Sequence, residues 1–378
     1  MDYKVVKLAK KLVSIPSISP LDLGCQDIIS LRLKKIGFII KNFIFNNTNN
    51  LWAYKGYGDN FVFLGHTDVV PPGNLNQWKF NPFKPTIENN ILYGRGISDM
   101  KGSIAAMVIA VENFVKKYPN YLGKISFLIT SDEESKALDG TKKVIEYLLR
   151  KNEIIKYCLI GEPTNKKKLG DTIKNGRRGS LNIQIKIYGI QGHIAYPKLL
   201  ENPIHKSIPF LNDLINLKWD NGNFFFSKSS LQISGIHSGE KNCSNVVPGS
   251  LQVNLNIRFN TEITLQVIKK KIKFLLLKHK LKNSIYWFFS GHPFLTKKKK
   301  FLSILKKSIK QVVNLKSSTS TSGGTSDGRF VNKMDCEILE FGLINSTIHK
   351  VNECANINDL KNLQKIYELT LKNIFINK

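Results

Sequence analysis

The sequence predicts an α/β protein in which one α/β domain is interrupted by an inserted α+β domain. In the first half of the chain, helical patterns alternate with short apolar runs such as Phe61–Leu64 and Tyr157–Ile160. Such runs are typical of strands buried on both faces of a parallel or mixed sheet. After Ser180, apolar residues alternate with polar ones, which indicates strands with only one buried face. The α/β style resumes after Pro293.

The expected elements follow from these periods and from the residues that interrupt them. Pro16 ends the first helix, Asp22 is a plausible N-cap of the second, and Gly37 follows the end of that second helix. The predicted helices cover residues 3–13, 22–36, 102–117, 141–151, 203–217 and 262–279, with a last helix ending near Phe375. The predicted strands cover residues 61–64, 124–130, 157–160, 181–187, 251–259 and 338–341. Residues 1–179 and 293–378 would form the split domain, and residues 180–292 the inserted one.

The composition fits a globular protein with two domains, because the chain has 378 residues of which 42% are hydrophobic. No apolar run reaches the roughly 18 residues that a membrane span needs. The N-terminal residues show no secretory signal, so we expect a cytoplasmic protein without a membrane partner. The five cysteines are scattered and form no C-x-x-C pair, which argues against a disulfide framework and against a thiolate zinc site.

The formal net charge of +29 has two explanations. A nucleic acid or an anionic membrane could be the partner. Alternatively, lysine is simply used heavily throughout the chain, since Lys297–Lys300 is the only long run. We find no recognition helix, RNP-like motif or basic–aromatic stripe, and therefore expect no nucleic-acid partner. A basic surface could still attract a small anionic substrate.

Polar residues collect where the predicted strands end. In open α/β sheets, sites lie at the carboxyl ends of the strands. The residues at or shortly after such ends, or at the start of the following helix, are His66, Asp68, Asp99, Glu133, Glu134, Glu162 and His349. Together they predict a site that combines imidazole and carboxylate groups.

This mixture of side chains suits a pair of catalytic metal ions. Imidazole and carboxylate ligands favour zinc, manganese or cobalt, and the lack of cysteine ligands indicates a catalytic site. Two pairs of terminal ligands, one bridging carboxylate and one bridging hydroxide would balance the charge of two dications. One carboxylate then remains as a base, and Glu133 beside Glu134 is the natural candidate.

Each residue also has a structural interpretation when it is taken alone. A histidine after a buried strand is often only a hydrogen-bonding residue, and Glu133-Glu134 could be a solvated turn. Glu162 could cap a turn, and Asp99 could be the N-cap of the helix that follows it. Spacing alone does not assign which ligand holds which metal.

The motifs around these residues resemble the dinuclear aminoacylase and carboxypeptidase superfamily. Within it, the chain is similar to the desuccinylases that act on N-succinyl-diaminopimelate. The motifs of the superfamily are Gly65–Pro71, Gly94–Gly96, Asp99–Gly102, Thr130–Glu134, Gly161–Pro163 and His349. Those of the narrower group are Lys174–Ser180, Gln191–Pro197, Gly323–Phe330 and Thr347–Cys354. The resemblance extends from end to end.

The resemblance implies a zinc-peptidase-like catalytic domain with a mixed sheet, split by an α+β lid and dimerisation domain. It also implies a homodimer with two divalent metal ions per subunit, zinc first and cobalt or manganese as alternatives. His66 and Glu162 would hold one ion, Glu134 and His349 the other, and Asp99 would bridge them.

The same resemblance implies roles around the metal ions. Asp68 would hydrogen-bond the second nitrogen of His66, as carboxylates behind a metal ligand do. Glu133 would be the general acid and base. His193 would reach across the dimer and stabilise the oxyanion in the partner's site. The substrate contacts would be Arg177, Arg178, Tyr196, Asn245, Arg258, Ser290, Gly324, Thr325 and Asn345. The family often has asparagine where this chain has Ser244, beside Asn245, which would alter contacts only locally.

The activity implied is hydrolysis of N-succinyl-LL-2,6-diaminopimelate to succinate and LL-2,6-diaminopimelate, which feeds lysine and cell-wall synthesis. A related deacylase such as an acetylornithine deacetylase, or a dipeptidase, would share the same metal ligands. A non-enzymatic relative would have lost a ligand or the glutamate base, and this chain retains all of them.

Overall fold

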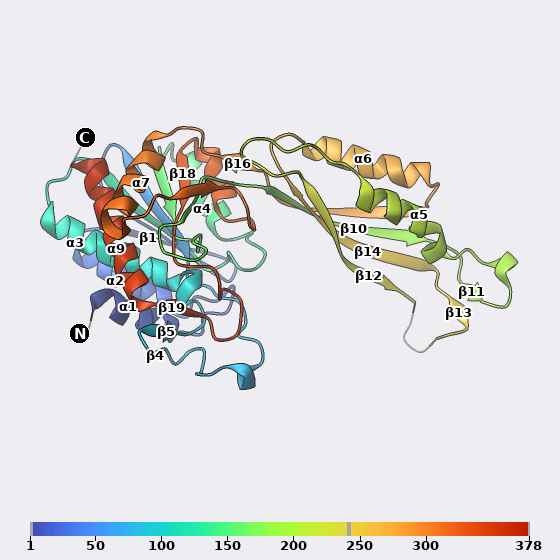
Figure 1. The fold of residues 1–378 in the computed structure, drawn as a ribbon, viewed down its shortest axis with the longest axis horizontal. Coiled ribbons are helices and arrows are strands. Elements are labelled where there is room, and N and C mark those ends of the chain that lie inside the picture. Colours follow the sequence, from blue (N-terminus) through green and yellow to red (C-terminus); the bar gives the residue numbers. More distant parts are fainter. Residues whose placement is uncertain (1–2, 240–242, 377–378) are drawn as a thin grey trace. The chain divides into compact units, whose positions relative to one another are not determined.

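The chain forms two compact units in the computed structural model, which describes residues 3–239 and 243–376 (Figure 1). Unit 1 contains the residues up to Gly176, Leu295–Ser320 and the residues from Ser326 onward. Unit 2 contains Arg177–Phe294 and the short segment Thr321–Thr325. This short segment falls within the stretch that we expected to belong entirely to the split domain. Two short strands, β9 (Gly176–Arg177) and β16 (Phe294–Leu295), lie where the chain crosses between the units.

Unit 1 is built on an eight-stranded mixed sheet with the order β1-β2-β6-β3-β7-β18-β8-β17. Its strands are β1 (Ile39–Phe45), β2 (Thr48–Gly56), β3 (Asn60–His66), β6 (Lys124–Thr130), β7 (Tyr157–Ile160), β8 (Thr172–Lys174), β17 (Ser318–Ser320) and β18 (Glu337–Glu340). The neighbours β6, β3, β7 and β18 run parallel, whereas β1 and β2 are antiparallel to their neighbours. The predicted α/β class with a mixed sheet is confirmed.

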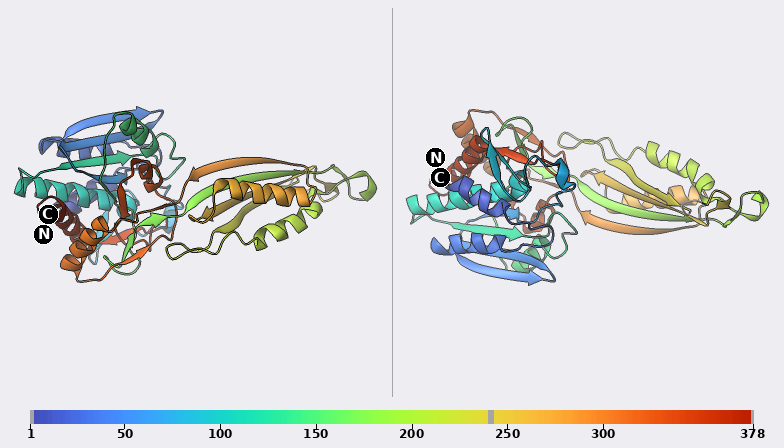
Figure 2. Two further views of the ribbon diagram at one scale, coloured as in Figure 1. Left: turned by 90° about the horizontal axis from the view of Figure 1, so that it is seen from above. Right: turned by 90° about the horizontal axis from the view of Figure 1, so that it is seen from below.

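Both faces of the central strands are covered by helices. Phe61 and Phe63 of β3 are fully buried in a core shared with α1, α2, α3, α7 and α9, and α4 packs near β2 and β6. The helices are α1 (Lys4–Val13), α2 (Cys25–Lys35), α3 (Gly102–Lys117), α4 (Thr141–Arg150), α7 (Lys300–Val313), α8 (Gly328–Val331) and α9 (Ile357–Phe375). Figure 2 shows α3 in teal and α9 in dark red lying together on this sheet. A second small sheet joins β4 (Thr86–Glu88), β5 (Ile91–Tyr93) and β19 (Cys354–Asn356).

The predicted N-cap of α2 is wrong in position. The helix begins at Cys25 and follows Gly24, which has a φ of 90°. The Asp22 carboxylate nevertheless accepts a hydrogen bond from the main-chain N–H of Gln26 at 3.0 Å. It also accepts one from the hydroxyl of Thr67 at 2.6 Å, so Asp22 ties the start of α2 to the residue that follows His66.

Unit 2 has the βαββαβ element order of ferredoxin-like folds. Its elements are β10 (Gly179–Tyr188), α5 (Pro203–Asn216), β12 (Ser230–Ser238), β14 (Ser250–Phe259), α6 (Leu265–Lys278) and β15 (Asn283–Gly291). The strands form an antiparallel sheet in the order β12-β14-β10-β15. Alternate residues of β10 and β14 are buried with α5 and α6, which lie on one face of the sheet (Figure 1). The period-two prediction for these strands is confirmed.

A short two-stranded ribbon extends from the sheet of unit 2 beyond the end of β10. It pairs β11 (Gly192–His193) with β13 (Val246–Val247). Among the residues that the structure describes, no helix is both long and apolar enough to cross a bilayer.

Candidate metal centre and active site

Four neighbouring parallel strands of unit 1 carry the predicted ligands to one edge of the sheet. His66 is the last residue of β3, Glu134 follows β6, Glu162 follows β7 and His349 follows β18. Because β6, β3, β7 and β18 are neighbours and run the same way, their carboxyl ends share this edge. The sheet therefore explains why residues far apart in the sequence meet.

Close backbone packing accompanies the turn after β7. A Cβ atom on Gly342 would lie 2.2 Å from the carbonyl oxygen of Gly161 and 2.5 Å from that of Glu162. Only glycine permits this approach between the chain after β18 and the chain after β7. Gly342 therefore allows Glu162 to lie beside the chain that follows β18.

Asp99 comes from a tight turn, Ile97–Lys101, that precedes α3. The N-cap of α3 is Lys101 and no side chain caps the helix, so the alternative role of Asp99 as N-cap is excluded. Asp99 is 7% exposed, and its two carboxylate oxygens face different histidines. Oδ1 lies 3.3 Å from Nε2 of His66, and Oδ2 lies 3.3 Å from Nε2 of His349.

The remaining two ligands complete two sets of three that share Asp99. Oε1 of Glu162 lies 3.6 Å from Nε2 of His66, and Oε1 of Glu134 lies 3.0 Å from Nε2 of His349. One set is therefore His66, Asp99 and Glu162, and the other is His349, Asp99 and Glu134. The family resemblance implied the same pairing, which stays a prediction, because His66, Asp99 and Glu134 also offer atoms within 4.8 Å of one another.

The spacing of these atoms fits metal ions held between them. Nitrogen and oxygen ligands bound at about 2.0 to 2.1 Å to a tetrahedral ion lie about 3.3 Å from one another. Moreover, Nε2 of His66 and Oδ1 of Asp99 are both buried, and neither has a hydrogen-bond partner within the described residues. A cation between these two buried atoms would accept an electron pair from each of them and so satisfy both.

The charges of the site act on one another strongly. The carboxylates of Asp99 and Glu134 raise the pKa of His349 to about 10. Burial works to lower the pKa of His66, but Asp99, Asp68 and Glu162 together hold that pKa well above its ordinary value. Burial likewise works to raise the pKa of Asp99, yet the two histidines keep it below its ordinary value. The carboxylates thus favour positive charge at this point of the site, and bound metal ions would supply it.

Glu133 lies beside this centre and is not one of the five residues in the two sets. Glu133, His66 and Glu162 each offer an atom within 4.8 Å of the others. Burial raises the pKa of the Glu133 carboxyl well above its ordinary value, and the negative charge of Glu162 adds to the effect. A carboxyl whose pKa is moved toward neutrality can both take up and release a proton during a reaction.

Asp68 supports the centre in a different way from the one expected. The second nitrogen of His66, Nδ1, lies 2.9 Å from the main-chain carbonyl of Asp68 and 3.6 Å from its carboxylate. The carboxylate instead accepts the main-chain N–H groups of Glu133 at 3.3 Å and Glu134 at 3.0 Å. Asp68 therefore orients Glu133 and Glu134 through their main-chain N–H groups, and orients His66 through its own carbonyl.

Most of the predicted substrate contacts belong to unit 2 and fall into two groups. Arg178, Arg258 and Ser290 lie at the end of the sheet where β10 begins. Nη1 of Arg178 donates to Ser230, the register partner of Arg258, at 3.4 Å.

Arg177 lies at the same end of unit 2 and holds the segment Thr321–Thr325. Its Nη1 donates to the carbonyl oxygen of Gly324 at 3.2 Å, and Thr325 follows Gly324 in this segment. Asn345 alone belongs to unit 1, where its main-chain N–H donates to Asn165 at 2.9 Å.

The second group in unit 2 lies at the opposite end of β10. His193 and Tyr196 have their ring centroids 5.7 Å apart, and the carbonyl of Asn245 accepts the N–H of Ile194 at 3.1 Å. His193, Tyr196 and Asn245 are all exposed. The ten residues of β10 separate this group from Arg178 by about 30 Å at the rise of an extended strand.

Two buried residues at the centre had no predicted role. Arg95 is 2% exposed and Glu353 is 1% exposed, and they form an ion pair of 2.9 Å behind Asp99. Arg95 lies in the motif Gly94–Gly96, and Glu353 lies in the motif Thr347–Cys354. Two opposite charges in motifs close to the predicted metal ligands could have indicated this ion pair from the sequence.

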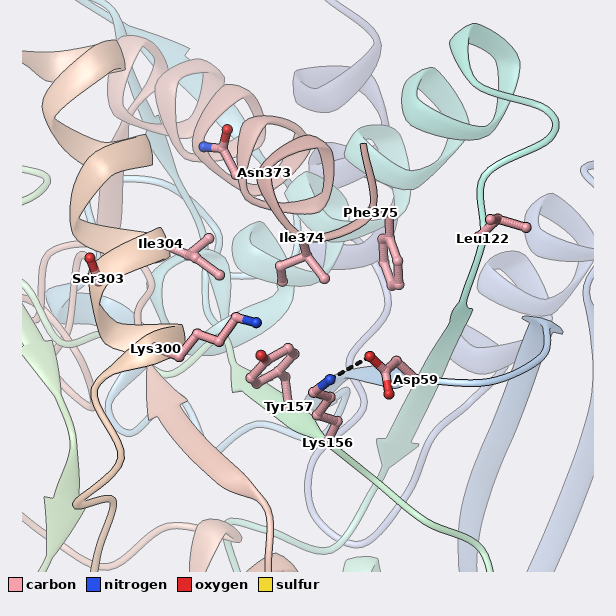
Figure 3. Close-up of a pocket in the computed structure, with 10 residues that line it drawn as sticks. All are labelled: Asp59, Leu122, Lys156, Tyr157, Lys300, Ser303, Ile304, Asn373, Ile374 and Phe375. Atoms are coloured by element: carbon pink, nitrogen blue, oxygen red, sulfur yellow. Dashed lines mark hydrogen bonds and ion pairs between the residues drawn. The ribbon is translucent and has the colours of Figure 1, made fainter. Parts of the chain in front are cut away.

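A separate cavity of about 460 Å³ in unit 1 lies away from these residues (Figure 3). Asp59 and Lys156 pair at its wall, and they directly precede β3 and β7. The cavity therefore opens where these strands begin, at the edge opposite the ligands. None of the candidate site residues lines it.

Comparison with known proteins places the chain in a family. Residues 62–373 match the model of Peptidase family M20/M25/M40. A succinyl-diaminopimelate desuccinylase of Buchnera aphidicola subsp. Baizongia pistaciae (strain Bp) is 55% identical over 371 residues, 98% of this chain and 98% of the relative. Another, from Buchnera aphidicola subsp. Acyrthosiphon pisum (strain APS), is 52% identical over 99% of this chain and 100% of the relative.

The fold has a solved counterpart. The crystal structure of an M20 family metallo-carboxypeptidase from Sulfolobus solfataricus matches with a TM-score of 0.84, covering 98% of this chain and 99% of that one at 20% identity. At that identity the match establishes the fold. With the family match over most of its length and relatives above 50% identity, the chain belongs to Peptidase family M20/M25/M40 and groups there with the succinyl-diaminopimelate desuccinylases.

Proposed function

We propose that the chain is a two-metal amide hydrolase that converts N-succinyl-LL-2,6-diaminopimelate and water into succinate and LL-2,6-diaminopimelate. The observation that carries this proposal is the bridging position of Asp99, whose two oxygens each lie 3.3 Å from a different histidine. The choice of the succinyl group rests on the full-length similarity to desuccinylases.

Two divalent ions per subunit would be held by the two sets that share Asp99. Zinc is the first choice, with cobalt or manganese as alternatives, because the donors are imidazole nitrogens and carboxylate oxygens. When bound, such ions lower the pKa of water toward neutrality and stabilise negative charge on oxygen.

Glu133 acts as the general base and then as the general acid of the reaction. It accepts one from the attacking water, whose oxygen forms a bond to the succinyl carbonyl carbon. It then donates that proton to the nitrogen of the breaking C–N bond, so the amine leaves neutral. The new carboxyl group gives its remaining proton to this amine, and the products are succinate and the ammonium form of LL-2,6-diaminopimelate. Asp68 keeps Glu133 in place through the hydrogen bond from the Glu133 main chain.

The substrate is anionic, and arginine is the side chain whose forked donors match a carboxylate. Arg178 and Arg258 lie near each other at one end of unit 2 and suit such a contact. Arg177 donates to Gly324, so its contribution would be to hold the loop that contains Thr325. Ser290 and Asn345 would add polar contacts, as the family resemblance implies.

His193 would serve the site of a second subunit in a homodimer. The chain passes between the units after Gly176, Phe294, Ser320 and Thr325, and His193 lies at the end of unit 2 opposite the start of β10. A distance of about 30 Å along β10 supports a role for His193, together with Tyr196 and Asn245, in the partner's site. There the imidazole would stabilise the negative oxygen of the tetrahedral state. A biosynthetic enzyme of this kind would work in the cytoplasm.

The direct test is turnover of the succinylated substrate by the purified protein, before and after chelation. We expect chelation to abolish activity and zinc to restore it, and the N-acetyl analogue to be hydrolysed far more slowly. Release of the free amine measures both reactions. Faster turnover of N-acetylornithine would favour the related deacetylase activity instead.

The neighbouring glutamates should separate catalysis from metal binding. Glu133→Gln is expected to keep both ions and to lower kcat by about 100- to 10,000-fold, because only the proton transfer is removed. Glu134→Gln, the matched control, is expected to lose the ion on the His349 side. Metal content by atomic emission and steady-state rates are the measurements, and near-normal kcat in Glu133→Gln would remove Glu133 from its role.

Mixing two inactive variants tests the shared site. In a hybrid of Glu133→Gln and His193→Ala, one of the two sites has both residues intact. Random exchange of subunits should therefore restore about a quarter of the wild-type activity. Each variant alone, treated identically, is the control. If the mixture stays as inactive as its components while hybrids are shown to form, His193 does not act across the dimer.

A further inference from the structure

The carboxylate of Glu353 is built into the turn that carries Asp99. Oε1 accepts the main-chain N–H groups of Ser98 at 2.9 Å and Asp99 at 3.1 Å. Oε2 accepts the main-chain N–H of Gly96 at 2.9 Å and Nη1 of Arg95 at 2.9 Å. One buried carboxylate thus satisfies a donor from each of the five consecutive residues 95–99 except Ile97.

Arg95 extends this connection to two other loops. Its guanidinium donates to the carbonyl of Lys350 at 3.0 Å, next to His349, and to that of Pro71 at 3.4 Å, in the loop that follows His66. The guanidinium also lies over the ring of Trp78, 5.1 Å from its centroid. The Arg95–Glu353 pair therefore contacts the three loops that contain His66, Asp99 and His349.

The His349 loop requires such support because its backbone is strained and its ligand is exposed. His349 has a φ of 59° and Asn352 a φ of 60°, a left-handed conformation that residues other than glycine and asparagine rarely adopt. The His349 side chain is 49% exposed, so packing alone does not fix it. Glu353, four residues later, is the buried anchor of this loop.

A buried ion pair is a costly way to gain stability, because removing two charges from water offsets much of their attraction. Apolar residues of similar size would fill the space at less cost. The Glu353 carboxylate, however, accepts four directional hydrogen bonds, and these permit only one arrangement of the Asp99 turn relative to the His349 loop. The pair therefore suits a role in positioning.

We propose that the Arg95–Glu353 pair is a positioning device that sets the distance between Asp99 and His349 and thereby the affinity of the ion on the His349 side. The inference rests on the proposed metal centre. Neither residue contacts the ions or the substrate; both act through the loops that hold the ligands.

Glu353→Gln tests this role, with Glu337→Gln as the matched control. Glu337 is also buried, at 8% exposure, and its carboxylate also accepts a main-chain N–H, that of Phe301 at 3.0 Å. It begins β18, at the edge of the sheet opposite the ligands. The two substitutions thus remove equivalent charges from different ends of the sheet.

The readouts are stepwise titration of the metal-free variants with Co²⁺, by calorimetry and visible absorption, and thermal unfolding of the metal-free forms. For Glu353→Gln we expect one ion to bind as in the wild type and the other about 10- to 100-fold more weakly, as for residues that support metal ligands. Raising the metal concentration should restore kcat with KM unchanged. Glu337→Gln should lower the unfolding temperature without altering either binding step.

The inference is overturned if Glu353→Gln binds both ions as the wild type does and differs only in unfolding temperature. Should this variant fail to fold, Arg95→Lys carries the same test, because lysine keeps the ion pair but lacks the fork that reaches Lys350 and Pro71. A wild-type protein that binds no second ion would instead refute the proposed metal centre, so the two failures are distinguishable.

Discussion

The site depends on one electrostatic constraint, the convergence of several carboxylates on a buried point. Asp99, Glu134 and Glu162 approach two histidines whose ring nitrogens face them. Grouping carboxylates at low exposure is unfavourable unless positive charge lies between them. Two dications would supply that charge, and Glu133, which is outside both sets, would remain available as the proposed base.

The fold meets this constraint by geometry. Four parallel strands end at one edge and bring their ligands there with little loop, since His66 is itself the last residue of β3. Gly342 allows the chain after β18 to approach the chain after β7 closely, and Gly161 leaves room for the side chains of Met100 and Met107. Asp99 and His349 come from longer turns, and these are the two places where Glu353 and Arg95 add buried hydrogen bonds. Unit 2 supplies a different kind of surface, a sheet whose two ends carry distinct groups of polar residues.

Much of this could be predicted from the sequence because local patterns were clear. Continuous apolar runs predicted β3, β6 and β7, and alternation predicted β10 and β14. β12 was not predicted, because its alternation of apolar and polar residues is interrupted by a register shift between Ile233 and Gly235. The hairpin of β1 and β2 was not predicted, although β1 is largely apolar and the Asn46-Asn47 pair between the strands was a turn signal.

The site residues were predictable as a set from the strand ends, but their pairing came only from the family resemblance. In the structure, Glu162 lies beside His66 and Glu134 lies beside His349. The Arg95–Glu353 contact joins residues 258 positions apart, beyond any local pattern. The contact between Asp68 and His66 could not be predicted either, because the main-chain carbonyl of Asp68, and not its carboxylate, lies next to Nδ1 of His66.

The most direct measurement of the central claim is X-ray absorption of the zinc-loaded protein. The arrangement around Asp99 predicts a shell of nitrogen and oxygen ligands, no sulfur, and scattering from a second metal at about 3.5 to 4 Å. A spectrum that shows isolated ions with no metal neighbour, or ligation by sulfur, would contradict the shared carboxylate on which the account is built.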